Sequence, residues 1–494
     1  MQTGMPDDPP EQQQGARDEA LEAVDAAWLR MDRPTNLMMI CGMMMLDGAI
    51  DPVAFKQIIR SRMLCFRRFR QRVVGGDGGG LGAIAGPPRW QTDPHFDLDW
   101  HVRHLALPDD SAALHELTSD LISTALDPGK PMWQFHLLVG TAGSAVVMRI
   151  HHCYGDGFAL LRLVDAITDL DPAHPQAGGV DLTPPPPPRA AWERIAGPLG
   201  ENAGDLLRLA LGAAGAGAAM LGQPGAALAR LRGGAALLRQ VGVIAAMAPD
   251  AVTRLKGELG VIKRVAWAPP LKLAEVKAVA AALACSVNDV LVAAITGALR
   301  DYLLAQGDAV DGAEVRALVP VNLRAPGPVK ELGNHFGMVF LNLPIGIDDP
   351  FARVFAVQRA MLALRHSQQA QVALAILAGM GVAPEFLKER LVAALAANAS
   401  LVVTNVRGPQ EARYLAGRRI ARQMFWVPQS GGIGLGVSLL SYAGEVSCGV
   451  VADVHRIADP DALAARFTAQ FEALLLLTLM MPWPQAVPAR RHGG

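Results

Sequence analysis

Two adjacent histidines, followed by an aspartate and a glycine, are the residues of this sequence best suited to chemistry. They lie in His151-His152-Cys153-Tyr154-Gly155-Asp156-Gly157, directly after a run of β-forming residues. A neutral imidazole at a strand end is a suitable general base near neutral pH. Because successive side chains of a strand point to opposite faces, we expect one histidine to face a cleft while the other packs inward. The segment therefore predicts an acid–base site.

The same residues also have interpretations without catalysis. A histidine at a strand end is often structural, and Asp156 suits an N-cap of the following helix or a pair with an arginine. A metal site is not predicted, since no third or fourth ligand lies nearby at suitable spacing. A nucleophilic pair of Cys153 with His152 is disfavoured as well, because neighbouring side chains of a continuing strand point apart.

Strands and helices alternate around this segment and again in the second half of the chain. Residues 144–150 are predicted to form a buried strand, and residues 158–170 a helix with apolar side chains at helical spacing. Further helices are predicted over residues 275–284 and 289–305, and strands over 315–321, 339–343 and 445–451. The pattern indicates an α/β or α+β fold in both halves.

Composition divides the 494 residues into two halves and a connector. Five consecutive prolines at 184–188 must be extended, and the Ala-, Gly- and Leu-rich stretch after them predicts helices. A glycine-rich run at 75–80 lacks the Gly-Lys-Ser/Thr ending of a phosphate-binding loop, so a surface loop is predicted. We expect four regions: a disordered tail over 1–17, a first half over 18–183, a connector over 184–260 and a second half over 261–485.

The chain is apolar and sparsely charged, with 51% hydrophobic residues, 18% charged residues and a formal net charge of -1. This excludes disorder for most of the chain and disfavours nucleic-acid binding, which needs clustered positive charge. The uncharged stretch 209–229 is rich in Ala and Gly and the apolar stretch 473–481 is short, so neither predicts a membrane span.

Five cysteines without a CxxC pair and a polar N-terminal segment predict a reducing, cytoplasmic location. Residues 206–255 or 474–481 suit contact with the surface of a membrane or lipid droplet. Simple packing of these segments between the halves is an equal alternative.

Residues 151–157 match HHxxxDG, and the chain thereby resembles the chloramphenicol acetyltransferase-like acyltransferases. Further segments resemble one branch, the bacterial wax ester synthase/diacylglycerol acyltransferases. Pro131-Met132-Trp133 with Gly140 resembles PLWxxxxxxG with Met in place of Leu, and Ser286-Val287-Asn288-Asp289-Val290 resembles the Asn-Asp motif. The remaining matches are the segments 24–29, 31–38, 333–335 and 405–409. All follow the family order over residues 21–455, which makes the set specific.

The resemblance implies two chloramphenicol acetyltransferase-like halves with the active site at their interface. It implies that His152 takes the proton of an acceptor hydroxyl as the oxygen attacks an acyl-CoA thioester, and then returns a proton to the thiolate. His151 is expected to face the interior. Asp156 is expected to support the loop through an arginine, for which Arg324 is a candidate.

Other residues of these motifs are candidates for substrate binding, among them Gly157. Asn288 has amide donors that suit a substrate or an oxyanion, whereas Asp289 forms with Ser286 the pattern of a capping box. Pro131 and Trp133 are expected near the site, although tryptophan also packs in cores.

An arginine run over residues 60–72 suits coenzyme A phosphates, but a solvated face is the favoured interpretation.

The function implied is esterification of a long-chain fatty alcohol or diacylglycerol to wax ester or triacylglycerol. Acyl-CoA is the co-substrate, and neither a cofactor nor a metal is expected. Two alternatives stay open: a condensation-type acyltransferase acting on carrier-bound substrates, and a non-catalytic lipid-binding protein of the same fold. The oligomeric state is not predicted.

Overall fold

The computed structural model describes most of both halves of the chain. The described residues are 19–75, 88–108, 110–141, 143–175, 250–324, 332–365, 369–382, 397–429 and 431–481, with single positions at 247, 367, 389, 392 and 393. The predicted tail, the five prolines, nearly all of the connector and residues 76–80 of the glycine-rich run lie outside the described residues. The expected region boundaries therefore stay predictions.

A first sheet of six strands has the order β13-β14-β2-β7-β6-β5. Its strands are β2 Met39–Asp47, β5 Val102–Ala106, β6 Trp133–Val139, β7 Gly143–His151, β13 Tyr414–Leu415 and β14 Arg418–Trp426. β7 pairs antiparallel with β2 on one side and β6 on the other. Because Val146 and Val147 in the middle of β7 are fully buried, this strand is held on both edges and both faces. It ends at His151, one residue beyond the predicted strand 144–150.

A second sheet has the order β11-β10-β12-β15-β16-β8, and the short β9 also pairs with β16. Its strands are β8 Lys263–Trp267, β9 Leu271–Lys272, β10 Val315–Asn322, β11 Phe336–Leu343, β12 Leu401–Arg407, β15 Leu435–Tyr442 and β16 Glu445–Asp453. β12 runs parallel to β10 and to β15, whereas the other pairs are antiparallel. The sheet therefore contains both parallel and antiparallel pairs. Sheets and helices occur in both halves, which confirms the predicted α/β or α+β fold class.

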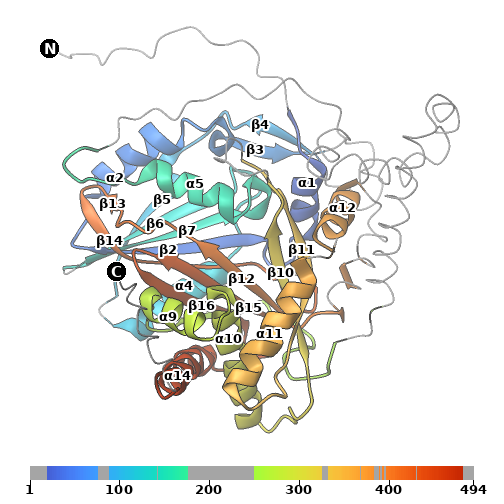
Figure 1. Cartoon of the computed structure of the whole chain (residues 1–494). Helices are drawn as coiled ribbons and strands as arrows, with labels where there is room; N and C mark the ends of the chain where they lie inside the picture. The colour runs from blue at the N-terminus through green and yellow to red at the C-terminus, as the bar shows by residue number, and fades with distance from the viewer. Residues whose placement is uncertain are drawn as a thin grey trace, which may run out of the picture.

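A small third sheet of β1, β4 and β3 covers Glu19–Ala20, Arg89–Thr92 and Gln71–Val74. The helices of the first half are α1 Ala23–Met31, α2 Pro52–Ile58, α3 Leu98–His101, α4 Ser111–Ser123 and α5 Gly157–Ile167. Those of the second half are α9 Leu273–Ala282, α10 Val287–Ala305, α11 Pro350–Arg365, α12 Gln369–Val382 and α14 Pro460–Leu479. In Figure 1, α2 and α5 lie on one side of the first sheet, while α9, α10 and α14 lie together beside the second.

Local sequence signals explain where these helices begin. Asp156 caps α5, and Asp51 caps α2, which starts with a proline. Ser286 and Asp289 form a complete capping box at the start of α10. The helices and strands that the sequence predicted are confirmed, with α5 ending at Ile167, three residues before the predicted end.

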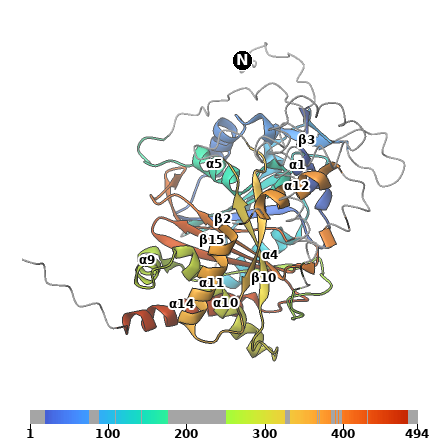
Figure 2. The same cartoon turned by 45° about the vertical axis from the view of Figure 1, so that its right-hand side comes forward.

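The two halves exchange elements. β13 and β14, from the second half of the chain, extend the first sheet by pairing with β2. α1, from the first half, packs against α12 and shares a buried cluster with β10 and β11. Figures 1 and 2 both show α1 beside α12 at one end of the second sheet. The HHxxxDG segment lies where these exchanged elements meet.

Candidate active site

β7 ends at His151, and a tight turn begins at His152. His152–Tyr154 forms a single 3₁₀ turn, and Asp156 then caps α5 by accepting hydrogen bonds from the N–H groups of Phe158 and Ala159 at 3.1 and 3.0 Å. Gly155 fits here because an added Cβ would lie 2.9 Å from the Cβ of Ala159. The strand, turn and helix thus hold this segment in one conformation.

His152 is buried and contacts the second half of the chain. Its Nδ1 lies 2.9 Å from Oδ1 of Asn334, and its backbone carbonyl accepts a hydrogen bond from Nδ2 of the same residue at 2.7 Å. The imidazole stacks on the Trp28 indole with ring centroids 4.1 Å apart, and Phe336 lies 5.6 Å away on centroids. Burial lowers the pKa of His152 to about 4, against the opposing charge of Asp156. The ring is therefore neutral near pH 7, as a general base requires.

His151 packs inward, as predicted. Its Nδ1 accepts a hydrogen bond from the N–H of Cys153 at 3.2 Å, and among the described atoms its Nε2 has no partner. Burial, with a smaller contribution from His152, lowers the pKa of His151 to about 3, so this ring is neutral too. The two histidines contact different neighbours, which fits the alternation expected at a strand end.

Asp156 has both of the roles considered for it. Besides capping α5, its Oδ2 forms an ion pair with Arg324 and accepts a hydrogen bond from the N–H of His335 at 3.0 Å. The second nitrogen of Arg324 donates to the carbonyl of Gly333 at 2.8 Å. The predicted pairing of Asp156 with Arg324 is therefore confirmed, and it ties the HHxxxDG turn to residues 333–335.

Three other residues of the HHxxxDG and PLW-like motifs were proposed from the sequence, and they differ in exposure. Gly157 is half-buried, and a Cβ added there would meet Val406 at an ordinary contact distance of 3.9 Å. Pro131 is buried just before β6. Trp133 packs in the core: its Nε1 donates to the carbonyl of Phe69 at 2.8 Å, and its ring stacks on His101. The described contacts of Trp133 account for it as a packing residue.

The Asn-Asp motif is tied to the Asn405 segment rather than to His152. Asn405 donates from Nδ2 to Oδ1 of Asn288 at 2.9 Å, so two segments of the resemblance meet at this pair. Asp289 completes the capping box at the start of α10. Its N–H donates a hydrogen bond to Ser286 Oγ at 3.1 Å, and its Oδ2 accepts one from the Ser286 N–H at 2.8 Å. These contacts give Asp289 a structural role, while Asn288 keeps its own Nδ2 for another acceptor.

Several members of the arginine run form ion pairs within the protein. Arg62 pairs with the buried Asp169 at 2.8 Å, and Arg67 and Arg68 both approach Glu19. Arg68 also lies over the Trp90 ring, 4.3 Å from its centroid. These contacts give a structural explanation for part of the run.

Three residues of the site were quoted only as parts of matching segments and not proposed for it: Asp25, Trp28 and Asn334. Asn334 contacts His152 over 182 positions, and Asp25 contacts Asn334 over 309. No local pattern predicts such pairs. The resemblance itself offered the signal, because segments 24–29 and 333–335 were among its matches.

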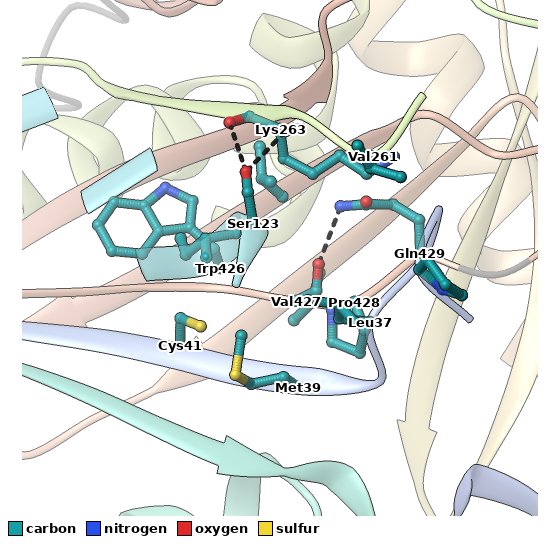
Figure 3. Close-up of a pocket in the computed structure, with 13 residues that line it drawn as sticks. Leu37, Met39, Cys41, Ser123, Val261, Lys263, Trp426, Val427, Pro428 and Gln429 are labelled. Atoms are coloured by element: carbon teal, nitrogen blue, oxygen red, sulfur yellow. Dashed lines mark hydrogen bonds between the residues drawn. The ribbon is translucent and has the colours of Figure 1, made fainter. Parts of the chain in front are cut away.

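A narrow cavity lies near the histidines, between β2 and β14 of the first sheet and β8 and β16 of the second (Figure 3). In Figure 3, Met39 and Cys41 lie below, while Trp426 lies above them beside Ser123, which is hydrogen-bonded to the backbone of Lys263. Met39 is the register partner of His151. Because paired residues of a sheet point to the same face, the cavity shares its face with His151.

Two family models match this chain. The wax ester synthase/diacylglycerol acyltransferase catalytic domain matches residues 21–291, more than half of the sequence, and the C-terminal domain of the same family matches residues 332–475. The chain belongs to this family. It is therefore an acyltransferase, as the HHxxxDG segment indicated.

Relatives of this acyltransferase extend over nearly its whole length. The probable diacylglycerol O-acyltransferase of Mycobacterium tuberculosis is 28% identical over 457 residues, covering 90% of this chain and 93% of the relative. The structure of the wax ester synthase/diacylglycerol acyltransferase from Marinobacter aquaeolei has a TM-score of 0.64 at 20% identity, covering 93% of this chain and all of that one. The trichothecene 15-O-acetyltransferase from Fusarium sporotrichioides has a TM-score of 0.60 at 12% identity, covering 93% and 94% of the chains. The two structures establish the shared fold.

Proposed function

We propose that this acyltransferase moves a long-chain acyl group from coenzyme A to the hydroxyl of diacylglycerol or a fatty alcohol, with His152 as the general base. The observation that carries the proposal is the neutral imidazole of His152, in the matched catalytic domain, whose Nδ1 contacts Asn334 of the matched C-terminal domain. The name of the mycobacterial relative supports diacylglycerol as one acceptor.

The reaction needs one base and no covalent enzyme intermediate. Nε2 of His152 removes the hydroxyl proton as the acceptor oxygen bonds to the thioester carbonyl carbon. The tetrahedral intermediate then collapses, the C–S bond breaks, and the imidazolium returns the proton to the thiolate. The products are one ester and one free coenzyme A. Binding both substrates beside one imidazole replaces a bimolecular encounter with an oriented one.

The surroundings of His152 favour transfer to an alcohol over hydrolysis. Trp28 and Phe336 cover the imidazole with apolar rings, and the side chain of His152 is buried. An apolar, water-poor site suits substrates that are mostly hydrocarbon. Acyl-CoA is accordingly proposed as a co-substrate, and no further cofactor is part of the mechanism.

The test is an assay with radiolabelled palmitoyl-CoA and either hexadecanol or diolein, with products separated by thin-layer chromatography. We expect wax ester, triacylglycerol or both from the native protein. His152→Ala should lower turnover by about 10²- to 10⁴-fold, the usual contribution of a positioned base. His174→Ala is the matched control, since His174 is an exposed histidine of the same half.

Near-normal ester formation by a folded His152→Ala protein would contradict the mechanism. Transfer only from a carrier-bound thioester would support the condensation-type alternative, and binding of diolein without turnover would support the non-catalytic one. Circular dichroism of each variant checks that the fold is retained.

We also propose a cytoplasmic location with contact to a lipid surface. Within the described residues, α14 is the single unbroken helix long and apolar enough to cross a membrane by length and composition. One face of α14 is buried through Leu463, Phe467 and Phe471, whereas Leu476 and Met480 near its end are exposed. This division supports a helix that packs on the protein and presents only its last turn to lipid.

A further inference from the structure

A buried aspartate, Asp25, is hydrogen-bonded to Asn334, the residue that contacts His152. Asp25 lies on α1, and its Oδ1 accepts a hydrogen bond from Nδ2 of Asn334 at 2.8 Å. The same Nδ2 donates to the backbone carbonyl of His152 at 2.7 Å, and Asn334 Oδ1 lies 2.9 Å from His152 Nδ1. Asp25, Asn334 and His152 thus form a hydrogen-bonded chain in the protein interior.

The partners of Asn334 determine which way its carboxamide faces. A backbone carbonyl can only accept a hydrogen bond, so the NH₂ group of Asn334 must lie on the side of the His152 carbonyl and Asp25. Each of the two amide hydrogens then has its own oxygen acceptor. The remaining Oδ1 faces His152 Nδ1, which must carry a hydrogen to bond it. Nε2 is left with the lone pair that a general base needs.

We propose that Asp25 is a positioning residue of the acyl transfer: by holding Asn334, it keeps His152 in the tautomer whose Nε2 is free to take the hydroxyl proton. The inference rests on the proposed role of His152 as the base. Without Asp25, one amide hydrogen of Asn334 loses its acceptor in a buried site, and only the His152 carbonyl is left to hold the NH₂ group, so the carboxamide is held less firmly.

The surroundings of Asp25 suit an uncharged carboxyl group. Burial, assisted by the negative charge of Glu22, raises the pKa of Asp25 to about 8, although the Asn334 hydrogen bond and Arg68 oppose the shift. The protonated form therefore dominates near pH 7, and its carbonyl oxygen still accepts from Asn334. Asparagine has the same shape as a protonated aspartate and offers the same acceptor.

Contacts with the backbone hold the hydrogen-bonded residues Asp25 and Asn334 in place. Arg30, on the same helix as Asp25, donates from Nη1 to the carbonyls of Met380 and Gly381 on α12, both at 3.1 Å. Gly333 has a φ of +116°, a conformation that glycine adopts readily, and it places Asn334 directly after the turn bound by Arg324. Asp25, the acceptor, is thus held by the contact of α1 with α12, and Asn334, the donor, by the turn that Arg324 binds.

Steady-state kinetics with palmitoyl-CoA and diolein test the proposal through two variants of one position. We expect Asp25→Ala to lower kcat by about 10- to 100-fold, the usual effect of losing a residue that orients a reacting group, with KM for palmitoyl-CoA nearly unchanged. Asp25→Asn should retain kcat within about threefold because it keeps the acceptor. Equal losses in the two variants, or full activity of Asp25→Ala, would overturn the proposal.

A double-mutant cycle separates positioning from simple stability. If Asp25 acts through Asn334, then Asp25→Ala should not lower kcat further in an Asn334→Ala protein. Losses that multiply in the double variant would contradict this, since independent effects add as free energies. Urea unfolding of all four proteins shows whether each remains folded under the assay conditions.

Nitrogen-15 NMR of histidine-labelled protein tests the tautomer without turnover. The His152 signal, assigned by its loss in His152→Gln, should report a hydrogen on Nδ1 in the native and Asp25→Asn proteins. Asp25→Ala should shift it toward a mixture of tautomers. A native ring with the hydrogen on Nε2 would refute the inference, even if the protein forms ester; the native tautomer found as expected in a protein that forms no ester would instead refute only the proposed function.

Discussion

The role proposed for His152 depends on its surroundings more than on its own residue type. An ordinary histidine is partly protonated at neutral pH, but burial here lowers the pKa to about 4. Asn334 orients the ring, and the stacked Trp28 shields it from water. His151, one position earlier, is also buried but has no such orienting carboxamide among the described residues. The two neighbouring histidines therefore differ in what holds their rings.

The low pKa of His152 predicts the acid side of the pH–rate profile. A base works in its neutral form, and a ring with a pKa of about 4 is almost fully neutral at every pH above 5. We therefore expect kcat/KM to stay level between about pH 5.5 and 7.5 and to fall only below about pH 5, as protonation removes the base. Initial rates in overlapping buffers measure this. An acid limb centred near 6.5 would show instead that His152 titrates as an exposed histidine does.

At the scale of elements, the close contact of α1 with α12 sets the position of the site. α1 carries both Asp25 and Trp28, and it approaches α12 so closely that a Cβ added to Gly381 would lie 1.7 Å from the carbonyl oxygen of Ala23. Any larger side chain at this position must push the two helices apart. By contrast, a Cβ added to Gly379 on the same helix would meet no atom within 4 Å.

These two glycines predict opposite effects of one substitution. Gly381→Ala should destabilise the protein by about 1–3 kcal/mol through overpacking and lower kcat, because α1 shifts with Asp25 and Trp28. Gly379→Ala should be neutral or stabilising by up to about 1 kcal/mol, since alanine favours the helix. Urea unfolding and the palmitoyl-CoA assay measure both effects. Equal unfolding free energies and equal kcat values in the two variants would show that the contact of α1 with α12 does not position the site.

On the scale of the whole molecule, the exchange of elements makes the two halves one structural unit. β14 pairs with β2 along most of its length, and α1 completes the buried cluster of the second half. His152 comes from one half and Asn334 from the other, so their contact exists only when both halves are assembled. The site proposed around His152 therefore lies at the interface of the two halves.

The molecule also presents an apolar end at the last turn of α14. Leu476, Leu479 and Met480 are more than half exposed, and the sequence continues with Trp483 and then the basic pair Arg490-Arg491. Figure 2 shows this end of α14 at the edge of the molecule. Exposed apolar side chains followed by tryptophan and arginine suit the interface of an anionic membrane.

The proposed lipid contact predicts a loss of vesicle binding. Leu476→Ser with Met480→Ser should lower the fraction that floats with phosphatidylcholine/phosphatidylglycerol vesicles several-fold, because about 1.5–3 kcal/mol of apolar transfer is lost for each side chain. Val53→Ser, at an exposed apolar position on α2, is the matched control and should float like the native protein. Unchanged flotation of the double variant would remove the last turn of α14 from the contact.

The local features of this protein can be predicted from its amino-acid order. The strand, turn and helix around His152 and the capping box of Ser286 and Asp289 follow from residue types at short spacing, and the family follows from the order of several short motifs. Such features depend on hydrogen bonds and side chains only a few positions apart. The order of residue types along the chain is therefore enough to predict them.

The residues that surround His152 became known from the three-dimensional fold alone. It brought Asn334 to His152 and Asp25 to Asn334, added β14 to the first sheet, and buried Trp133 in the core. These contacts join positions up to 309 residues apart. Their geometry depends on how closely packed elements meet, as at Gly381 against Ala23, and close packing is a property of the assembled interior that no short spacing along the chain expresses.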